Sequence, residues 1–273
     1  MTALIRVDTQ PGRERPFVIA CLALLVAVCW ACLVFRALRM ANIDPAALPA
    51  AAAARGTFSA AFSPIPSPYR LPELGLVLGM WGAMLSAIML PATTPAILLF
   101  ARISRLVHTV RFPNLATLMF VGGCLLVWGS FGTLATLVQW ALHDMGALDA
   151  GMAVGNQNAC GLVLVAAGVY QWTPAKHACL QHCRAPLSFM VTGWRLGLFG
   201  ALRMGAVHGL YCTGCCWLLT LLLFAAGVTN LGALLALAGL VLAEKLSPGG
   251  SVVACVGGLA LVAWGTLLLF PQA

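Results

Sequence analysis

Residues 74–101 read LGLVLGMWGAMLSAIMLPATTPAILLFA, an apolar run without a single charged side chain. A helix crosses the hydrocarbon core of a bilayer with about 20 apolar residues, so this run is long enough to span a membrane. Pro91 and Pro95 fall within it, and each proline removes a backbone donor and clashes with the preceding turn. We therefore expect a transmembrane helix that is kinked or unwound near the middle of the membrane.

The rest of the chain repeats this pattern. Hydrophobic residues make up 62% of the 273 residues and charged residues 8%, whereas soluble domains have about 25% charged residues. Long apolar runs between short polar stretches favour helices over a β-barrel, whose strands would alternate in polarity. The expected fold class is all-α, a polytopic transmembrane helix bundle of about seven spans, or six, at residues 17–35, 74–101, 115–142, 153–172, 196–228, 231–243 and 252–270.

The chain is expected to have three parts. Residues 1–38 are an N-terminal tail and the first transmembrane helix, and residues 39–73 are an Ala/Pro-rich outer loop. Residues 74–273 are the helical membrane core, in which residues 173–195 form a cytoplasmic Cys/His loop. For the first span a cleavable signal peptide is the alternative, but the apolar region is longer than such peptides usually have.

The distribution of basic residues predicts the orientation. With the N-terminus in the cytoplasm, eleven of the fifteen Lys and Arg residues lie on the cytoplasmic side, in keeping with the positive-inside rule. We therefore expect a multi-pass protein of the bacterial inner (cytoplasmic) membrane, with the lipid bilayer as its main partner. The net charge of +8 does not indicate a nucleic-acid partner, because the basic residues lie next to apolar spans, where they meet anionic lipid.

Sequence motifs of common enzymes are absent from the chain. There is no Walker loop, no G-x-S-x-G, no H-E-x-x-H and no dinucleotide fingerprint. We therefore predict no catalytic residues and favour a function that is not enzymatic, although the sequence leaves this open. Glu244 and Lys245, at the end of the sixth span, are expected to form an interfacial ion pair.

The strongest site signal is HGLYCTGCC, residues 208–216. His208 and Cys212 are four residues apart, and Cys215 and Cys216 follow three and four residues later, so all four side chains share one stripe of a helix. Three thiolates and an imidazole are soft ligands suited to Cu(I) or Zn(II). One straight helix cannot surround an ion, so either its glycines let it open or another helix supplies ligands. The alternative is that these cysteines only pack.

Two other elements could complete such a site. The loop at residues 173–195 carries two cysteines and a histidine at helical spacing, although a solvated loop is the alternative interpretation. Methionines in residues 74–101 offer thioethers, which favour Cu(I) over Zn(II), although methionine also fills gaps in cores. The predicted metal ligands are His208, Cys212, Cys215, Cys216, Cys179, His182, Cys183, Met84 and Met89.

Four motifs together resemble a known family. They are MLPATTPAILLFA (residues 89–101), YQWTPAK (170–176), CLQHCRAP (179–186) and HGLYCTGCCW (208–217). The chain resembles, over about residues 74–270, an uncharacterised bacterial family of predicted metal-binding integral membrane proteins. This resemblance implies that the Cys and His motifs bind a metal, without naming the metal or the mechanism.

The sequence supports three functional hypotheses. The first is a membrane protein that binds a soft metal, copper as Cu(I) with zinc as the alternative, for delivery, insertion or transport, together with a metal-donating or metal-accepting protein. The second is a membrane thiol oxidoreductase, because Cys212 and Cys215 have C-x-x-C spacing. The third is a non-catalytic helper subunit of a membrane complex.

Overall fold

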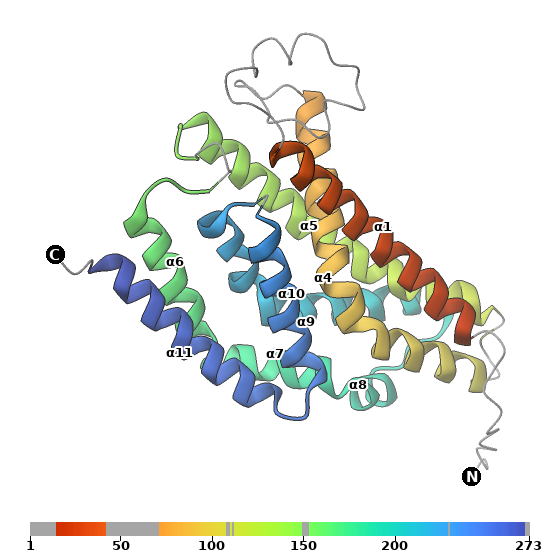
Figure 1. Ribbon diagram of the computed structural model, residues 1–273. Helices are drawn as coiled ribbons and strands as arrows, with labels where there is room; N and C mark the ends of the chain where they lie inside the picture. The colour runs from red at the N-terminus through yellow and green to blue at the C-terminus, as the bar shows by residue number, and fades with distance from the viewer. Residues whose placement is uncertain are drawn as a thin grey trace.

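The computed structural model describes residues 15–41, 71–107, 110, 112–148, 153–228 and 230–270. Most of the N-terminal tail and of the predicted outer loop at residues 39–73 lies outside these described residues. Nine helices form the described part: α1 (Arg15–Ala41), α4 (Leu71–Leu106), α5 (Pro113–Asp144), α6 (Gln157–Tyr170), α7 (Pro174–Arg184), α8 (Pro186–Thr192), α9 (Gly197–Ala226), α10 (Leu231–Leu246) and α11 (Gly250–Leu269). Figure 1 shows α1 on one side of this bundle, with α6 and α11 on the other.

Five helices are long and apolar enough to cross a membrane, and they lie in α1, α4, α5, α9 and α11. The all-α fold class is therefore confirmed. Helices α6 and α10 occupy two further predicted spans but have only 14 and 16 residues. The count of seven spans and the cytoplasmic N-terminus stay predictions.

Helix α4 takes one of the two forms expected from its two prolines. The helix is continuous from Leu71 to Leu106, with Pro91 and Pro95 inside it, so of the two expected forms, kinked or unwound, it is not the unwound one. The Thr94 hydroxyl donates to the Leu90 carbonyl oxygen at 2.8 Å, which supplies a bond beside the prolines. Figure 1 shows that the axis of α4 changes direction along its length, as prolines in a helix commonly cause.

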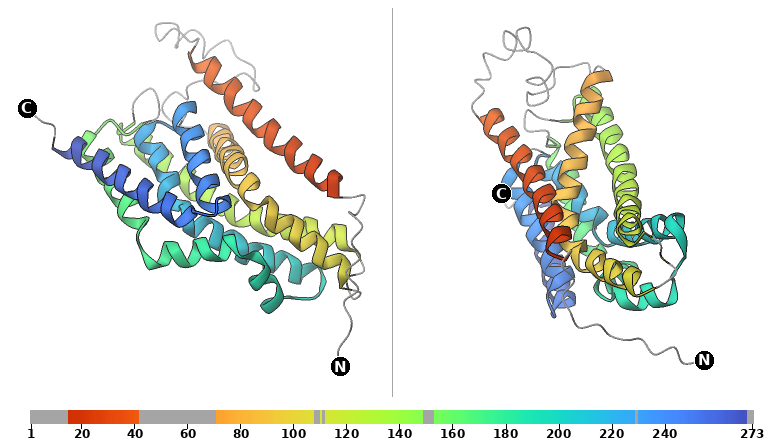
Figure 2. Two further views of the ribbon diagram at one scale, coloured as in Figure 1. Left: turned by 60° about the horizontal axis from the view of Figure 1, so that its bottom comes forward. Right: turned by 90° about the vertical axis from the view of Figure 1, so that its right-hand side faces the viewer.

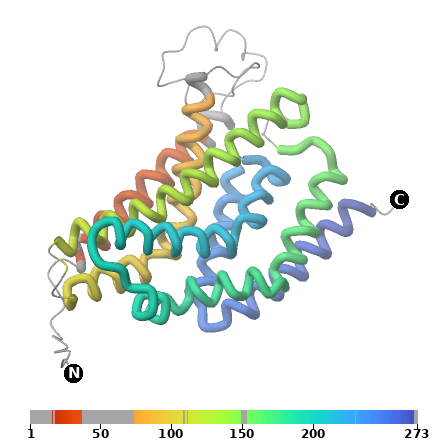
Figure 3. The backbone as a smooth tube through the Cα atoms, turned by 180° about the vertical axis from the view of Figure 1, so that it is seen from behind, coloured from red at the N-terminus to blue at the C-terminus, as the bar shows by residue number. Residues whose placement is uncertain are grey.

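Glycines allow the long helices to pack with their backbones close together. A Cβ on Gly205 of α9 would overlap the Phe120 carbonyl oxygen of α5, and a Cβ on Gly123 would overlap the backbone of α9. At the same contact the Cys124 thiol donates to the Gly205 carbonyl oxygen at 3.2 Å. Figure 3 shows α5 lying across α9. Small residues at a helix interface are typical of transmembrane bundles.

The predicted loop at residues 173–195 forms the two short helices α7 and α8. Thr173 caps α7 by accepting a bond from the Lys176 amide, and Pro174 occupies the first turn, both of which favour a helix start. Helix α7 packs against α9 and also contacts α10, and Figure 2 shows this end of the bundle from two further directions. The Cys and His residues of the predicted loop are therefore held on a helix beside α9.

Candidate metal site

Helix α9 buries the four predicted ligands of its motif. His208, Cys212, Cys215 and Cys216 are each at most 1% exposed. The Cys215 and Cys216 thiols donate to the Cys212 carbonyl oxygen, at 3.1 and 3.0 Å. These residues therefore form one buried face, as the spacing predicts. The helix is continuous through them and does not open at its glycines.

Helix α4 contributes a thioether to this face. The Sδ atom of Met89 lies 3.7 Å from the Sγ atom of Cys212 and 3.6 Å from that of Cys216. Thr93, one turn further along α4, places its hydroxyl oxygen 3.7 Å from the Cys212 sulfur. Two helices that are far apart in the sequence thus bring three sulfur atoms together.

Helix α7 adds a fourth thiol. The Cys183 side chain lies within hydrogen-bonding reach of the Cys212 and Cys215 sulfurs. We call Met89, Cys183, Cys212, Cys215 and Cys216 the sulfur group. The two Cys clusters of the sequence therefore meet at one place.

Cys179 lies one turn before Cys183 and marks how closely α7 approaches α9. Its sulfur would be 3.0 Å from a Cβ placed on Gly214, which is closer than an ordinary van der Waals contact. Burial raises the pKa of the Cys179 thiol above its usual value. Cys179 therefore touches the helix of the sulfur group and is kept as a neutral thiol.

The two predicted histidines form a pair beside the sulfur group. The ring centroids of His182 and His208 are 6.2 Å apart, and His182 stacks on Tyr211 at 3.7 Å between centroids. Within the described chain, His182 Nε2 and His208 Nδ1 are buried and have no hydrogen-bond partner. Burial lowers the pKa of the His182 imidazole, so its ring is neutral near pH 7 and keeps a lone pair that can bind a metal.

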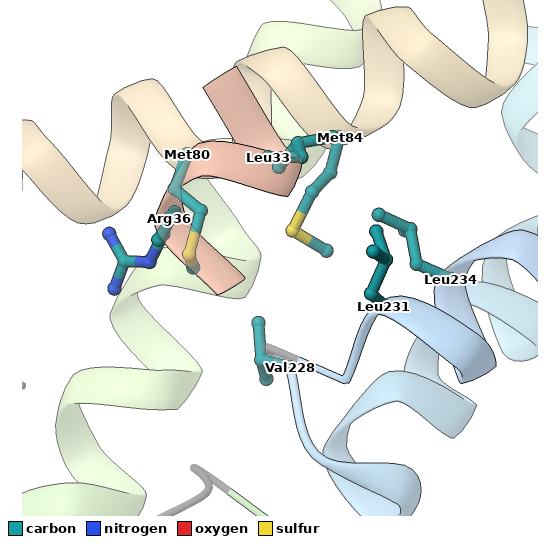
Figure 4. A pocket seen from close by; sticks show the side chains of 7 residues that line it. All are labelled: Leu33, Arg36, Met80, Met84, Val228, Leu231 and Leu234. Carbon is teal, nitrogen blue, oxygen red and sulfur yellow. The ribbon is translucent and has the colours of Figure 1, made fainter. Parts of the chain in front are cut away.

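Met84 lies in a different place from the sulfur group. Together with Met80 it lines a pocket, shown in Figure 4, whose other walls are Leu33, Arg36, Val228, Leu231 and Leu234. Met89 follows Met84 by five residues, which turns its side chain about 140° around the helix axis. The site that the structure assembles therefore includes Met89 but not Met84.

Lys245 was not predicted as part of the site. Its ammonium nitrogen lies 2.8 Å from the Cys212 sulfur and 3.8 Å from the Met89 sulfur. The predicted ion pair between Lys245 and Glu244 is wrong, because the Glu244 carboxylate pairs with Lys176 at 2.7 Å. Consecutive residues on a helix point about 100° apart, so the two side chains face different neighbours. The one feature of the sequence that could have indicated this role is the presence of a lysine at the end of an apolar helix.

The sulfur group does not surround a common point. Among the residues that the structure describes, no group of three or more His, Cys, Asp or Glu side chains is arranged so that it could hold a metal ion. Two of the thiols point back to the Cys212 carbonyl oxygen, and the Lys245 ammonium contacts both the Cys212 and the Met89 sulfur. Binding of one ion by several sulfurs therefore needs side-chain rotation.

Comparison with known proteins identifies the family. The family model of PpoB2, described as a copper chaperone, matches residues 78–268. This range runs from α4 into α11 and includes the sulfur group, the histidine pair and Lys245. No curated protein and no solved structure gives a significant match. Since the matched range covers more than half of the sequence, the chain belongs to the PpoB2 copper chaperone family.

Proposed function

We propose that this protein is an integral membrane copper chaperone that binds Cu(I) at the sulfur group and passes it to a partner protein. The observation that carries the proposal is the position of Met89, whose Sδ atom lies 3.7 and 3.6 Å from the Cys212 and Cys216 sulfurs. A thioether between two thiols is a poor arrangement for Zn(II) and a good one for Cu(I). Membership of a copper chaperone family supports the same metal.

The buried cysteines of α9 lie beside a charged side chain, which supports metal binding over packing alone. Cys212, Cys215 and Cys216 are at most 1% exposed, and the Lys245 ammonium contacts the Cys212 sulfur. Ionisable groups inside a membrane bundle are costly and mark functional sites. We therefore assign Cys212, Cys215, Cys216, Cys183 and Met89 as the copper ligands.

The histidine pair extends the proposed site toward α7. His182 and His208 offer neutral nitrogen ligands 6.2 Å apart between ring centroids, and His208 lies one turn before Cys212. Nitrogen ligands bind Cu(I) less tightly than several sulfurs do, and they suit a step at which copper enters or leaves. We propose that copper passes this pair on its way between the sulfur group and a copper-donating or copper-accepting protein.

The outer surface of the bundle supports insertion into a bilayer. Large apolar side chains point outward along the long helices, as in Leu118 (64% exposed) and Leu126 (60%) of α5 and Leu259 (64%) of α11. Lipid tails would cover such a surface, whereas water would not. We propose a bacterial inner membrane location with a cytoplasmic N-terminus, which places α7 and the sulfur group toward the cytoplasm.

Metal analysis of purified protein tests the proposal. Protein in detergent, kept under a reductant and loaded with Cu(I), is expected to retain about one equivalent. The variant with Cys212, Cys215 and Cys216 changed to Ser is expected to lose it. The matched control changes three exposed cysteines, Cys21, Cys32 and Cys255, to Ser and is expected to bind as the wild type does. Equal copper in all three proteins, or none in the wild type, would refute the proposal.

A thiol oxidoreductase is the second candidate. The observation that favours it is the contact of Cys183 with Cys212 and Cys215, which are two thiols in C-x-x-C spacing. Such thiols could form a disulfide and exchange it with a partner. Trapping of free thiols in cells distinguishes the two functions, because a chaperone that holds Cu(I) keeps these cysteines reduced under every growth condition.

A further inference from the structure

Lys245 occupies an unusual position for a charged side chain. It belongs to the last turn of α10, is only 6% exposed, and places its ammonium nitrogen 2.8 Å from the Cys212 sulfur and 3.8 Å from the Met89 sulfur. Lysines at helix ends in membranes normally extend to the polar interface. Here the side chain turns inward, toward the atoms assigned to copper.

Two contacts hold the end of α10 in this arrangement. The Glu244 carboxylate accepts bonds from Lys176 at 2.7 Å and from Gln171 at 2.9 Å. Arg184 at the end of α7 donates to the carbonyl oxygens of Ser247 and Pro248, at 2.9 and 2.7 Å. The residues before and after Lys245 are thus hydrogen-bonded to neighbouring elements. These bonds fix the backbone at the end of α10 so that the Lys245 side chain points inward.

The charge on Lys245 needs a negative neighbour. A buried ammonium is strongly unfavourable unless it is paired and hydrogen-bonded. Glu244, the preceding residue, already accepts hydrogen bonds from Lys176 and Gln171. The remaining acidic group that Lys245 contacts is the Cys212 thiol, 2.8 Å from its ammonium nitrogen.

Copper and the Lys245 ammonium need the same atoms. A protonated amine has no lone pair, so it cannot be a ligand, and the Cys212 and Met89 sulfurs that it contacts are the ones proposed to bind Cu(I). An ammonium and Cu(I) both carry one positive charge. Replacing one with the other therefore leaves the charge of the buried cluster unchanged, whereas Zn(II) would add a second charge.

We infer that Lys245 is a built-in competing cation of the sulfur group, and that Cu(I) binding expels its ammonium from its contacts with the Cys212 and Met89 sulfurs. This inference rests on the proposed function. The competition lowers the net affinity for copper and favours release, which a chaperone needs because it must give its cargo away. On release, the ammonium returns to its contacts with the Cys212 and Met89 sulfurs.

Amine labelling tests the displacement directly. The sequence has two lysines, Lys176 and Lys245, so each modified peptide is assigned without ambiguity. Purified full-length protein, with and without Cu(I), is treated briefly with an amine-acetylating reagent and analysed by mass spectrometry. We expect acetylation of Lys245 to rise at least fivefold with copper. Lys176, which is fully buried against Glu244, is the internal control and is expected not to change.

Two substitutions test the competition independently. The variant Lys245→Met removes the charge and keeps the length of the side chain, and we expect it to bind Cu(I) at least tenfold more tightly in competition with a chromogenic Cu(I) chelator. Lys245→Arg keeps the charge and is expected to stay within about threefold of the wild type.

Copper content is measured in the same samples, so that a failure of the proposed function can be distinguished from a failure of the inference about Lys245. A wild type without copper refutes the proposed function and the inference together. A wild type that carries copper while Lys245 labelling stays constant, or a Lys245→Met variant that binds copper no more tightly, overturns the inference alone.

Discussion

The buried ion pair between Lys176 and Glu244 predicts a large and specific loss of stability. Their charged atoms are 2.7 Å apart, and the two residues are 0% and 1% exposed. In a Glu244→Gln variant, the carboxylate that accepts from both Lys176 and Gln171 becomes an amide. One of its two contacts then places donor against donor, and the Lys176 ammonium loses its counter-charge.

The magnitude follows from the burial of both groups. Removing one partner of a buried ion pair costs about 3–5 kcal/mol, because the other charge is left uncompensated. For a chain of this size about 1 kcal/mol corresponds to roughly 2–4 °C, so we expect the unfolding temperature to fall by roughly 10 °C. The double variant Lys176→Met with Glu244→Gln removes both charges and is expected to recover most of this loss.

A fluorogenic maleimide reports the transition in detergent, because Cys124, Cys212, Cys215 and Cys216 are buried and react only on unfolding. Asp144→Asn is the control, since Asp144 is exposed at the end of α5 and its substitution should change little. If Glu244→Gln unfolded at the wild-type temperature, or if the double variant were no more stable than the single one, the buried pair would not have the role described here.

Two further predictions test the ligand set and the helix packing. Met89→Leu is expected to weaken Cu(I) binding by about 10- to 100-fold, because it removes a thioether from the sulfur group. Met84→Leu, in the pocket of Figure 4, should change the affinity less than twofold in the same chelator competition, and equal effects of the two substitutions would refute the assignment. Gly205→Ala is expected to destabilise the fold by about 1–3 kcal/mol through overlap with α5, while Gly79→Ala, whose Cβ meets nothing within 4 Å, should not, as measured by thermal unfolding; a stable Gly205→Ala variant would contradict the close packing of α5 and α9.

Local spacing determined what could be predicted from the sequence. Apolar length and helical period are properties of single segments, so the helical fold class and the shared face of His208, Cys212, Cys215 and Cys216 followed from the residues alone. The same geometry could have separated Met84 from Met89, because five residues turn a side chain about 140° around a helix. The sequence predicted that Pro91 and Pro95 would kink or unwind α4 but not which of the two, because neighbouring helices decide how a transmembrane helix accommodates proline.

Contacts between distant segments could not be predicted in this way. The approach of Met89 to Cys212 and Cys216 joins α4 to α9, and that of Cys183 joins α7 to α9. Periodicity within one helix gives no information on its neighbours. Lys245 was assigned to Glu244 because they are adjacent in sequence, but helical geometry points them to different partners, and only the packed bundle shows which ones.

X-ray absorption spectroscopy at the copper edge tests the central claim, that copper is held by the sulfur group, most directly. Protein loaded with one equivalent under a reductant is expected to give a Cu(I) edge and a first shell dominated by sulfur. In the Met89→Leu variant that shell should lose part of its sulfur content. A first shell dominated by nitrogen or oxygen, or one that is identical in the two proteins, would contradict the account.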